Sequence, residues 1–308
     1  MLRSKRGVRY RRERIELADG DFVDLDWAAD AEGRRPDDTA PLVLVLHGLE
    51  GSTSSDYVLE TVRALARRGL ASAALNFRSC SGVMNRLARF YHSGDTADVA
   101  VVITDIKQRF PGRPLGAIGF SLGGNVLVKY LGECSRVGND EGTPDAAVGI
   151  SVPYDLARGI ETLEFGRGRW YQPYFLRRLR RKVRLKADLL GDFVNVEQLL
   201  KVRTLRAFDD LGTAPLHDFL DSADYYRHAS SKPYLPDVRC PTLLIHAVDD
   251  PFLPADAIPR REVAENPWLE SLFTPSGGHV GFVAGPPWAP VFWAEASAAA
   301  FLADRLAG

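Results

Sequence analysis

A serine, an aspartate and a histidine that lie far apart in the sequence are the residues best suited to chemistry. Residues 119–123 read GFSLG, a GxSxG pattern. In this pattern the serine sits on a sharp turn between a strand and a helix, and small residues two positions away on either side avoid a collision. Such a turn presents the Ser121 hydroxyl for nucleophilic attack. The alternative is a glycine-rich turn with an incidental serine. The strand-like sequence before the motif and the helix-like sequence after it favour the nucleophile.

The acid and the base are expected after two later strands. Asp249 and Asp250 follow the apolar run 241–247, and His279 follows a pair of glycines. A carboxylate holds an imidazole in one tautomer and stabilises its protonated form. Asp250, directly before Pro251, occupies the usual acid position, and Asp249 is then a loop or turn-capping carboxylate. Both are turn-forming residues, so the sequence separates them poorly. Of the six histidines, only His279 lies beyond the acid.

Two backbone N–H groups are expected to hold a developing oxyanion. Residues 47–52, HGLEGS, follow an all-apolar run. The loop after that strand supplies one donor and the residue after the nucleophile supplies the other, which assigns the roles to Leu49 and Leu122. Backbone donors suit this task because they are fixed before charge develops. His47 and His92 are interpreted as side chains that shape their loops.

These residues can form one site if the strands before them belong to a parallel sheet, because ligands bind beyond the carboxyl ends of parallel strands. The chain alternates strand-like and helix-like segments after a hairpin signal at Asp19-Gly20. The expected strands are 41–46, 70–76, 115–120, 146–152, 241–247 and 270–273. The expected helices are 56–68, 96–109 with Ser93 or Asp95 near its N-cap, 122–131 and 289–306. The predicted class is α/β, a mostly parallel sheet flanked by helices.

The alternation breaks between residues 153 and 238, which predicts a helical lid inserted into a core of residues 1–152 and 239–308. Residues 166–186 contain nine basic residues and no acidic one, interleaved with aromatic residues. One interpretation is a lid that covers an acyl chain while its arginines contact an anionic membrane. The other is a helix with a solvated basic face and an apolar face that packs on the core. Runs of like charge are usually solvated faces of this kind. Asp209 and Asp210 are expected to be turn and cap residues.

Composition excludes several other classes. The 308 residues carry a net charge of −1, so nucleic acid is not expected as a partner. Cys80, Cys134 and Cys240 form no metal or disulfide pattern. No apolar run approaches the roughly 18 residues of a membrane span. The basic residues 1–14 lack a secretory apolar region and are interpreted as a basic arm on a cytoplasmic protein. Dinucleotide, P-loop and HExxH motifs are absent. No cofactor, metal or obligate protein partner is therefore expected.

Longer motifs carry a family resemblance. They are HGLEGS (47–52), NFRSCSG (76–82), NRLARFYHSGDTAD (85–98), GFSLGGN (119–125), FDDLGTAP (208–215), DYYRHASS (224–231), DDPF (249–252) and GGHVGF (277–282). With these motifs the chain resembles the YheT-type α/β-hydrolases, which are esterase- and lipase-like proteins. The resemblance runs from about residue 12 to residue 301 and places Ser121, Asp250 and His279 at the family's triad positions. Ser79 is a departure, because the family pattern has glycine there.

The resemblance implies hydrolysis of carboxylic esters, with lipid-like substrates in several members. The leading hypothesis is therefore a serine esterase for medium-chain or lipid-like acyl esters, with a small-molecule acyl ester as its substrate. Some relatives make esters from acyl-CoA and an alcohol, so acyl transfer on the same triad is the first alternative. A non-catalytic binding protein on this fold is the second, since fold alone does not fix function.

Overall fold

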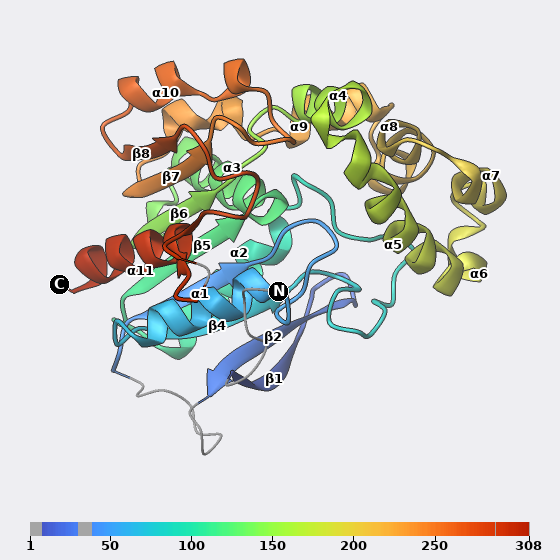
Figure 1. Ribbon diagram of the computed structural model, residues 1–308. Coiled ribbons are helices and arrows are strands. Elements are labelled where there is room, and N and C mark those ends of the chain that lie inside the picture. Colours follow the sequence, from blue (N-terminus) through green and yellow to red (C-terminus); the bar gives the residue numbers. More distant parts are fainter. Residues whose placement is uncertain (1–7, 30–38, 287, 308) are drawn as a thin grey trace.

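A central twisted sheet organises the computed structural model, which describes residues 8–29, 39–286 and 288–307. Within these ranges eight strands form one sheet in the order β1-β2-β4-β3-β5-β6-β7-β8 (Figure 1). β3 to β8 run parallel, and the N-terminal hairpin β1–β2 adds antiparallel strands at the edge beside β4. The strands are β1 (Arg9–Glu16), β2 (Phe22–Ala29), β3 (Leu42–Leu46), β4 (Ala71–Asn76), β5 (Leu115–Phe120), β6 (Ala146–Ile150), β7 (Thr242–Ala247) and β8 (Leu269–Thr274).

Helices cover both faces of this sheet, which explains the all-apolar strand sequences. β3, β5 and β6 are buried along their whole length. The apolar faces of α1 (Asp56–Ala66) and α11 (Trp293–Leu306) form one core with the sheet. Those of α2 (Ala97–Arg109) and α3 (Leu122–Arg136) form a second core on the opposite face. The predicted α/β class with a mostly parallel sheet is thus confirmed.

Some element boundaries differ from the sequence prediction for local reasons. Asp95 does lie next to the N-cap of α2, which is Thr96, so the helix begins one residue later than expected. No side chain caps this helix, and Asp95 pairs with Arg89 at 2.8 Å. The C-terminal helix begins only at Trp293, because β9 (Val283–Ala284) and β10 (Val291–Phe292) form a short hairpin before it. The basic residues 9–14 belong to edge strand β1 and not to an arm. Residues 1–7 and most of the predicted loop at 30–40 lie outside the described residues.

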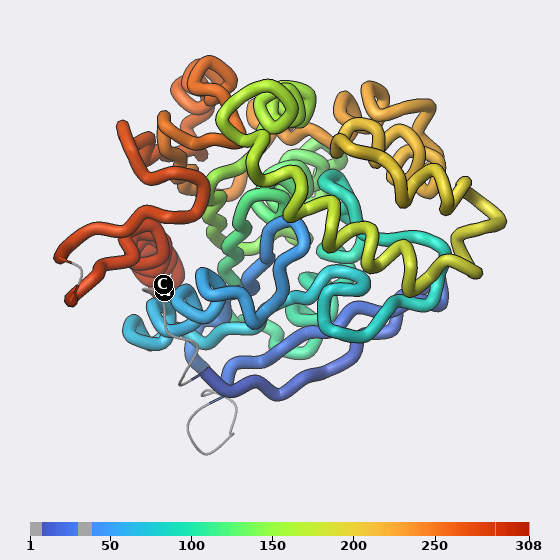
Figure 2. The backbone as a smooth tube through the Cα atoms, turned by 45° about the vertical axis from the view of Figure 1, so that its right-hand side comes forward, coloured from blue at the N-terminus to red at the C-terminus, as the bar shows by residue number. Residues whose placement is uncertain are grey.

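The lid segment, residues 153–238, leaves the sheet after β6 and returns to it at β7. All of it is described, and it consists of helices and turns. Its helices are α4 (Leu156–Phe165), α5 (Gln172–Leu185), α6 (Ala187–Leu190), α7 (Val196–Lys201), α8 (Leu205–Phe208) and α9 (Ser222–Ala229), with a one-turn π-helix at Asp209–Thr213. The segment has its own apolar core, which includes Phe175, Val183 and Leu199. Figures 1 and 2 show α5 to α7 as a lobe projecting to one side of the sheet.

The remaining helix, α10 (Arg260–Glu265), lies between β7 and β8. Among the described residues, no helix has both the length and the apolar character needed to cross a bilayer.

Candidate active site

Ser121 occupies a strained turn between β5 and α3. Its φ of 51° and ψ of −120° lie in a region that side chains rarely adopt. The turn forms only because its neighbours are glycines. A Cβ on Gly119 would come within 2.5 Å of the Gly123 carbonyl oxygen, and one on Gly123 would come within 2.5 Å of the His47 carbonyl oxygen. The Ser121 N–H donates to the Ile150 carbonyl at 2.8 Å, which fixes the turn on the sheet.

The structure brings the three predicted side chains together from the ends of β5, β7 and β8. Ser121 Oγ lies 2.8 Å from His279 Nε2. On the other side of the ring, His279 Nδ1 lies 2.8 Å from Asp250 Oδ2 and 3.1 Å from Oδ1. With the proton on Nδ1, His279 donates to the carboxylate and leaves Nε2 free to accept the hydroxyl proton. This is the arrangement that a general base and its orienting acid require.

The two neighbouring aspartates take different places. Asp250 is buried, and besides contacting His279 it accepts the Phe252 N–H at 2.8 Å. Asp249 Oδ1 accepts the N–H groups of Gly277 and Gly278 at 2.9 and 2.8 Å. Asp250 therefore contacts the imidazole of His279, whereas Asp249 holds the loop that carries His279.

A second histidine lies behind Asp250. His246, in β7, is fully buried, and its Nε2 is 3.5 Å from Asp250 Oδ2. Burial lowers the pKa of His246 to about 4, so it is neutral near pH 7. Near pH 7 His246 therefore adds no positive charge beside Asp250.

The loop after β3 passes directly beside Ser121. A Cβ on Gly48 would come within 3.1 Å of Ser121 Cβ. The Gly48 N–H donates to the Tyr57 hydroxyl at 2.8 Å, and the Glu50 N–H donates to the Tyr91 hydroxyl at 2.6 Å. Among the described residues no acceptor is bonded to the Leu49 N–H between them, and the Leu122 N–H begins α3, where helical N–H groups have no partner. Both predicted oxyanion donors are thus available.

His47 shapes this loop, as its interpretation from the sequence requires. Its Nδ1 is 2.7 Å from the Gly48 carbonyl oxygen, and its Nε2 accepts the Phe77 N–H at 3.2 Å. Burial lowers the pKa of His47 to about 3, so the ring is neutral and joins two backbones. His92 shapes its loop as well, because its Nδ1 accepts the Gly94 N–H at 3.1 Å. Its ring packs against His217 and Tyr225, and burial lowers its pKa to about 3.

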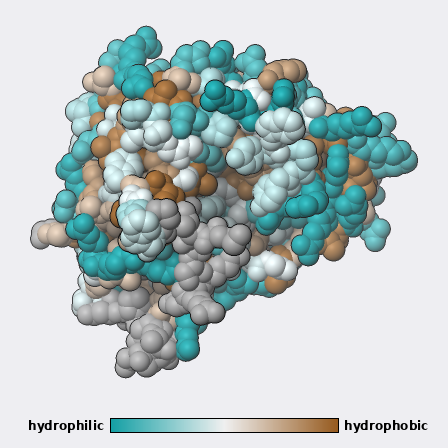
Figure 3. Space-filling view, viewed as in Figure 1, coloured by the Kyte–Doolittle hydropathy of each residue, from teal (hydrophilic) through white to brown (hydrophobic). Residues whose placement is uncertain are grey.

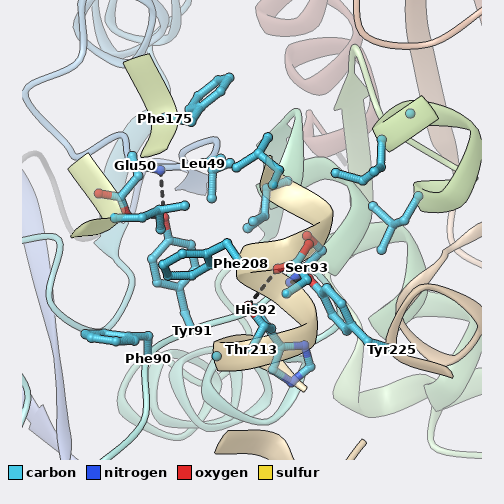
Figure 4. Close-up of a pocket in the computed structure, with 18 of the residues that line it drawn as sticks. Leu49, Glu50, Phe90, Tyr91, His92, Ser93, Phe175, Phe208, Thr213 and Tyr225 are labelled. Atoms are coloured by element: carbon cyan, nitrogen blue, oxygen red, sulfur yellow. Dashed lines mark hydrogen bonds between the residues drawn. The ribbon is translucent and has the colours of Figure 1, made fainter. Parts of the chain in front are cut away.

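An apolar cavity of about 130 Å³ opens from Ser121 under the lid segment. Ser121, Leu122 and Leu49 lie at its sheet end together with His279. Figure 4 shows the rings of Phe208, Tyr91 and Tyr225 around this space. Further aliphatic and aromatic side chains from the lid line it, among them Leu156, Ile160, Leu163, Phe175, Leu179, Leu199 and Leu205. The cavity fits an apolar chain whose reacting end lies at the sheet.

Two polar features of this cavity were not predicted from the sequence. Lys182, on α5, donates to Glu50 Oε1 at 2.6 Å, and Tyr91 donates to the same oxygen at 3.1 Å. Glu50 and Lys182 are 132 residues apart, and no local pattern indicates such a contact. Asp209, expected to be a turn residue, instead accepts from Tyr226 and Thr213, each at 2.7 Å, on the cavity wall. Burial raises its pKa to about 6. Asp210 does cap, by accepting the Ser222 N–H.

Among the described residues, no group of three or more histidine, cysteine, aspartate or glutamate side chains is arranged to hold a metal ion.

Comparison with known proteins gives the class of this fold first. The family described as alpha/beta hydrolase fold matches residues 41–286. Among solved structures, the Pyrococcus furiosus esterase Pf2001 superposes with a TM-score of 0.57 at 17% identity, covering 89% of this chain and 86% of that one. Brefeldin A esterase superposes with a TM-score of 0.60 at 16% identity, covering 98% and 78%. At these identities the structures show the shared fold alone.

Relatives matched by sequence give a more specific family assignment than the fold alone. The putative esterase YheT of Escherichia coli is 42% identical over 285 residues, 92% of this chain and 82% of that protein. The phospholipase ABHD3 of Mus musculus is 32% identical over 92% of this chain and 69% of its own length. The monoacylglycerol lipase of Saccharomyces cerevisiae is 34% identical over 80% of this chain, which spans only 56% of that lipase. The chain belongs to the α/β-hydrolase family, in its YheT-type group of esterase- and lipase-like hydrolases.

Proposed function

We propose that this protein is a serine hydrolase for medium-chain or lipid-like carboxylic esters. One observation carries the proposal: Ser121, His279 and Asp250 form a hydrogen-bonded series with 2.8 Å at each link, at the sheet end of an apolar cavity. The relatives named as an esterase, a monoacylglycerol lipase and a phospholipase support ester chemistry. Most of the residues that line the cavity are aliphatic or aromatic, which supports an acyl chain as the bound part.

In the proposed mechanism Ser121 Oγ attacks the ester carbonyl while His279 Nε2 takes the hydroxyl proton. The negative oxygen of the tetrahedral intermediate accepts from the Leu49 and Leu122 N–H groups. Collapse of the intermediate breaks the ester C–O bond, and His279 returns its proton to the leaving alcohol. Water then attacks the acyl-enzyme with His279 again as base, which releases the carboxylic acid and restores Ser121.

The decisive test combines labelling with turnover. A fluorophosphonate is expected to label Ser121, and a series of p-nitrophenyl esters of increasing acyl length is expected to give the highest kcat/KM at medium or longer chains. Ser121→Ala is expected to lose labelling and at least about 10³-fold in kcat while keeping the wild-type melting temperature. Ser54→Ala, which alters an exposed serine after the 47–52 loop, is the matched control.

Other outcomes of the same experiment would identify the alternatives. Turnover that survives in Ser121→Ala would refute the nucleophile. Absence of labelling and of turnover in the folded wild-type protein would favour a binding protein. Added alcohol that diverts most of the acyl group into a new ester, in place of free acid, would assign acyl transfer.

A further inference from the structure

The outer side of the lid segment exposes an unusual set of large apolar side chains. Phe165 is 78% exposed and Trp170 is 76% exposed, while Leu185 and Phe193 are each 60% exposed. Tyr171, Tyr174 and Leu189 are exposed as well. These side chains belong to one continuous stretch, residues 165–193, whose exposed surface is called the lid face here. Clusters of exposed apolar side chains are uncommon on a surface that only contacts water.

Arginines on the same stretch point outward as well. Helix α5 buries Phe175, Leu176 and Val183 in the lid core, as the second sequence interpretation expects of its apolar face. Its opposite side exposes a row of arginines, with two more on the turn before it: Arg167, Arg169, Arg177, Arg178, Arg181 and Arg184. The acidic residues on the lid face are Asp188 and Asp192, at its C-terminal end. Figure 3 shows strongly hydrophilic residues next to hydrophobic ones on the lobe formed by α5 to α7.

These six arginines are not used inside the protein. Across the part of the chain that the structure describes, none of them forms an ion pair with a carboxylate, whereas Arg12, Arg136 and Arg305 each do. Two of them contact exposed rings instead: Arg178 donates to the Tyr174 hydroxyl at 2.8 Å, and Arg169 lies 5.0 Å from the Trp170 ring centroid. Unpaired cations beside aromatic and aliphatic side chains are typical of surfaces that lie at a lipid headgroup layer.

A groove next to the arginines gives anionic headgroups a place to sit. It has a volume of about 580 Å³ and is lined by Arg177, Arg178, Arg181 and Arg184 on one side and by the loop with Ser79 and Cys80 on the other. Glu50 and Lys182 line both this groove and the cavity at Ser121. A headgroup in the groove would therefore lie on one side of Glu50 and Lys182, with the acyl cavity on their other side.

We propose that the lid face docks this protein on an anionic phospholipid surface. The arginines contact phosphate groups, and Phe165, Trp170, Leu185 and Phe193 enter the layer between headgroups and acyl chains. The arginines could also bind nucleic acid, but exposed leucines would make no favourable contact with it. A bilayer interface suits both the arginines and the apolar side chains. The docking depends on the lid face and not on Ser121, so it stands or falls separately from the proposed reaction.

The test is sedimentation of the full chain with vesicles. Wild-type protein and Ser121→Ala are expected to bind phosphatidylglycerol-containing phosphatidylcholine vesicles at low salt, and far more weakly to pure phosphatidylcholine. Salt that shortens the Debye length from about 10 Å to about 3 Å is expected to release most of the protein. The variant Arg177→Gln with Arg178→Gln, Arg181→Gln and Arg184→Gln is expected to lose about a hundredfold or more in vesicle partition coefficient.

The matched control removes four exposed arginines elsewhere, at Arg11, Arg68, Arg239 and Arg261, and is expected to bind within about threefold of wild type. Thermal unfolding checks that both variants fold. A blue shift of tryptophan emission on vesicle binding, lost in Trp170→Phe, would report apolar insertion. Equal loss in both quadruple variants, salt-independent binding or no binding to anionic vesicles at low salt would overturn the proposal. Salt-sensitive binding to polyuridylate without vesicle binding would overturn it in favour of a nucleic-acid surface.

Discussion

Asp249 and Asp250 are neighbours in the sequence, yet each accepts hydrogen bonds from a different part of the His279 loop. The sequence identified the pair and favoured Asp250 by its position before Pro251. It could not separate them firmly, because aspartates form turns at either position and the deciding contacts are with residues 28 or 29 positions later. Because the two carboxylates contact different groups, replacing each of them is expected to change turnover by a different amount.

Asp250→Asn is expected to lower kcat about 10³–10⁴-fold, because an amide can donate to His279 Nδ1 and force the wrong tautomer. Asp249→Asn is expected to cost about tenfold or less, since the asparagine carbonyl still accepts both glycine N–H groups. Ester turnover under saturating substrate measures both, and Asp256→Asn, at an exposed position, serves as the control. A larger loss in Asp249→Asn than in Asp250→Asn would exchange their roles.

Ser79 shows how far a residue type alone can be interpreted. The family resemblance predicts glycine there, and the structure gives Ser79 a φ of 63°, which glycine adopts without strain. The serine hydroxyl compensates by donating to Asn85 Oδ1 at 2.5 Å and accepting the Asn85 N–H at 3.1 Å. The sequence thus located an unusual backbone position, but the compensating contact depends on a loop conformation that no local pattern encodes.

At the scale of elements, the strands and the main helices were predictable because each has a local apolar pattern, whereas their contacts with the lid were not. The sequence indicated that residues 153–238 are helical and inserted. It could not indicate that Lys182 on α5 reaches Glu50 in the loop after β3. Burial disfavours the Lys182 ammonium, but Cys80 and the Glu50 carboxylate outweigh that effect and raise its pKa. The lid is therefore attached by a buried ion pair to the loop that carries the Leu49 N–H.

Lys182→Met is expected to lower kcat for a short ester about 10–100-fold with little change in KM, because the oxyanion donor then loses its fixed position. Pairing it with Glu50→Gln is expected to recover stability but not turnover, since no buried charge then stays unpaired. Lys201→Met, in an exposed pair on α7, is the control. Wild-type kcat in Lys182→Met would show that the loop is held without the lid.

At the scale of the whole molecule, one buried arginine joins three distant segments. Arg78, after β4, donates to Asp98 at the start of α2 at 2.8 and 2.7 Å. It also donates to Asp19 at 2.7 Å and to Asp21 at 3.0 Å in the turn of the β1–β2 hairpin. The side chains of Arg78, Asp21 and Asp98 are at most 3% exposed. The hairpin is thus fixed to the sheet by charge as well as by strand pairing.

Arg78→Met is expected to lower the free energy of unfolding by about 3–5 kcal/mol near pH 7, because it leaves buried carboxylates without their cation. Burial opposes ionisation of Asp21, yet hydrogen bonds from Asn85 and two backbone N–H groups, together with the Arg78 charge, hold its pKa below the ordinary value. A depressed carboxyl pKa contributes stability that is present above about pH 4 and is lost as the pH falls through the lower folded value. The difference in unfolding free energy between wild type and variant is therefore expected to shrink on acidification.

Urea unfolding of both proteins across this pH range measures the difference, with Arg78→Lys as the charge-preserving control. A loss that is equally large below pH 4, or smaller than about 1 kcal/mol at pH 7, would mean that strand pairing alone holds the hairpin.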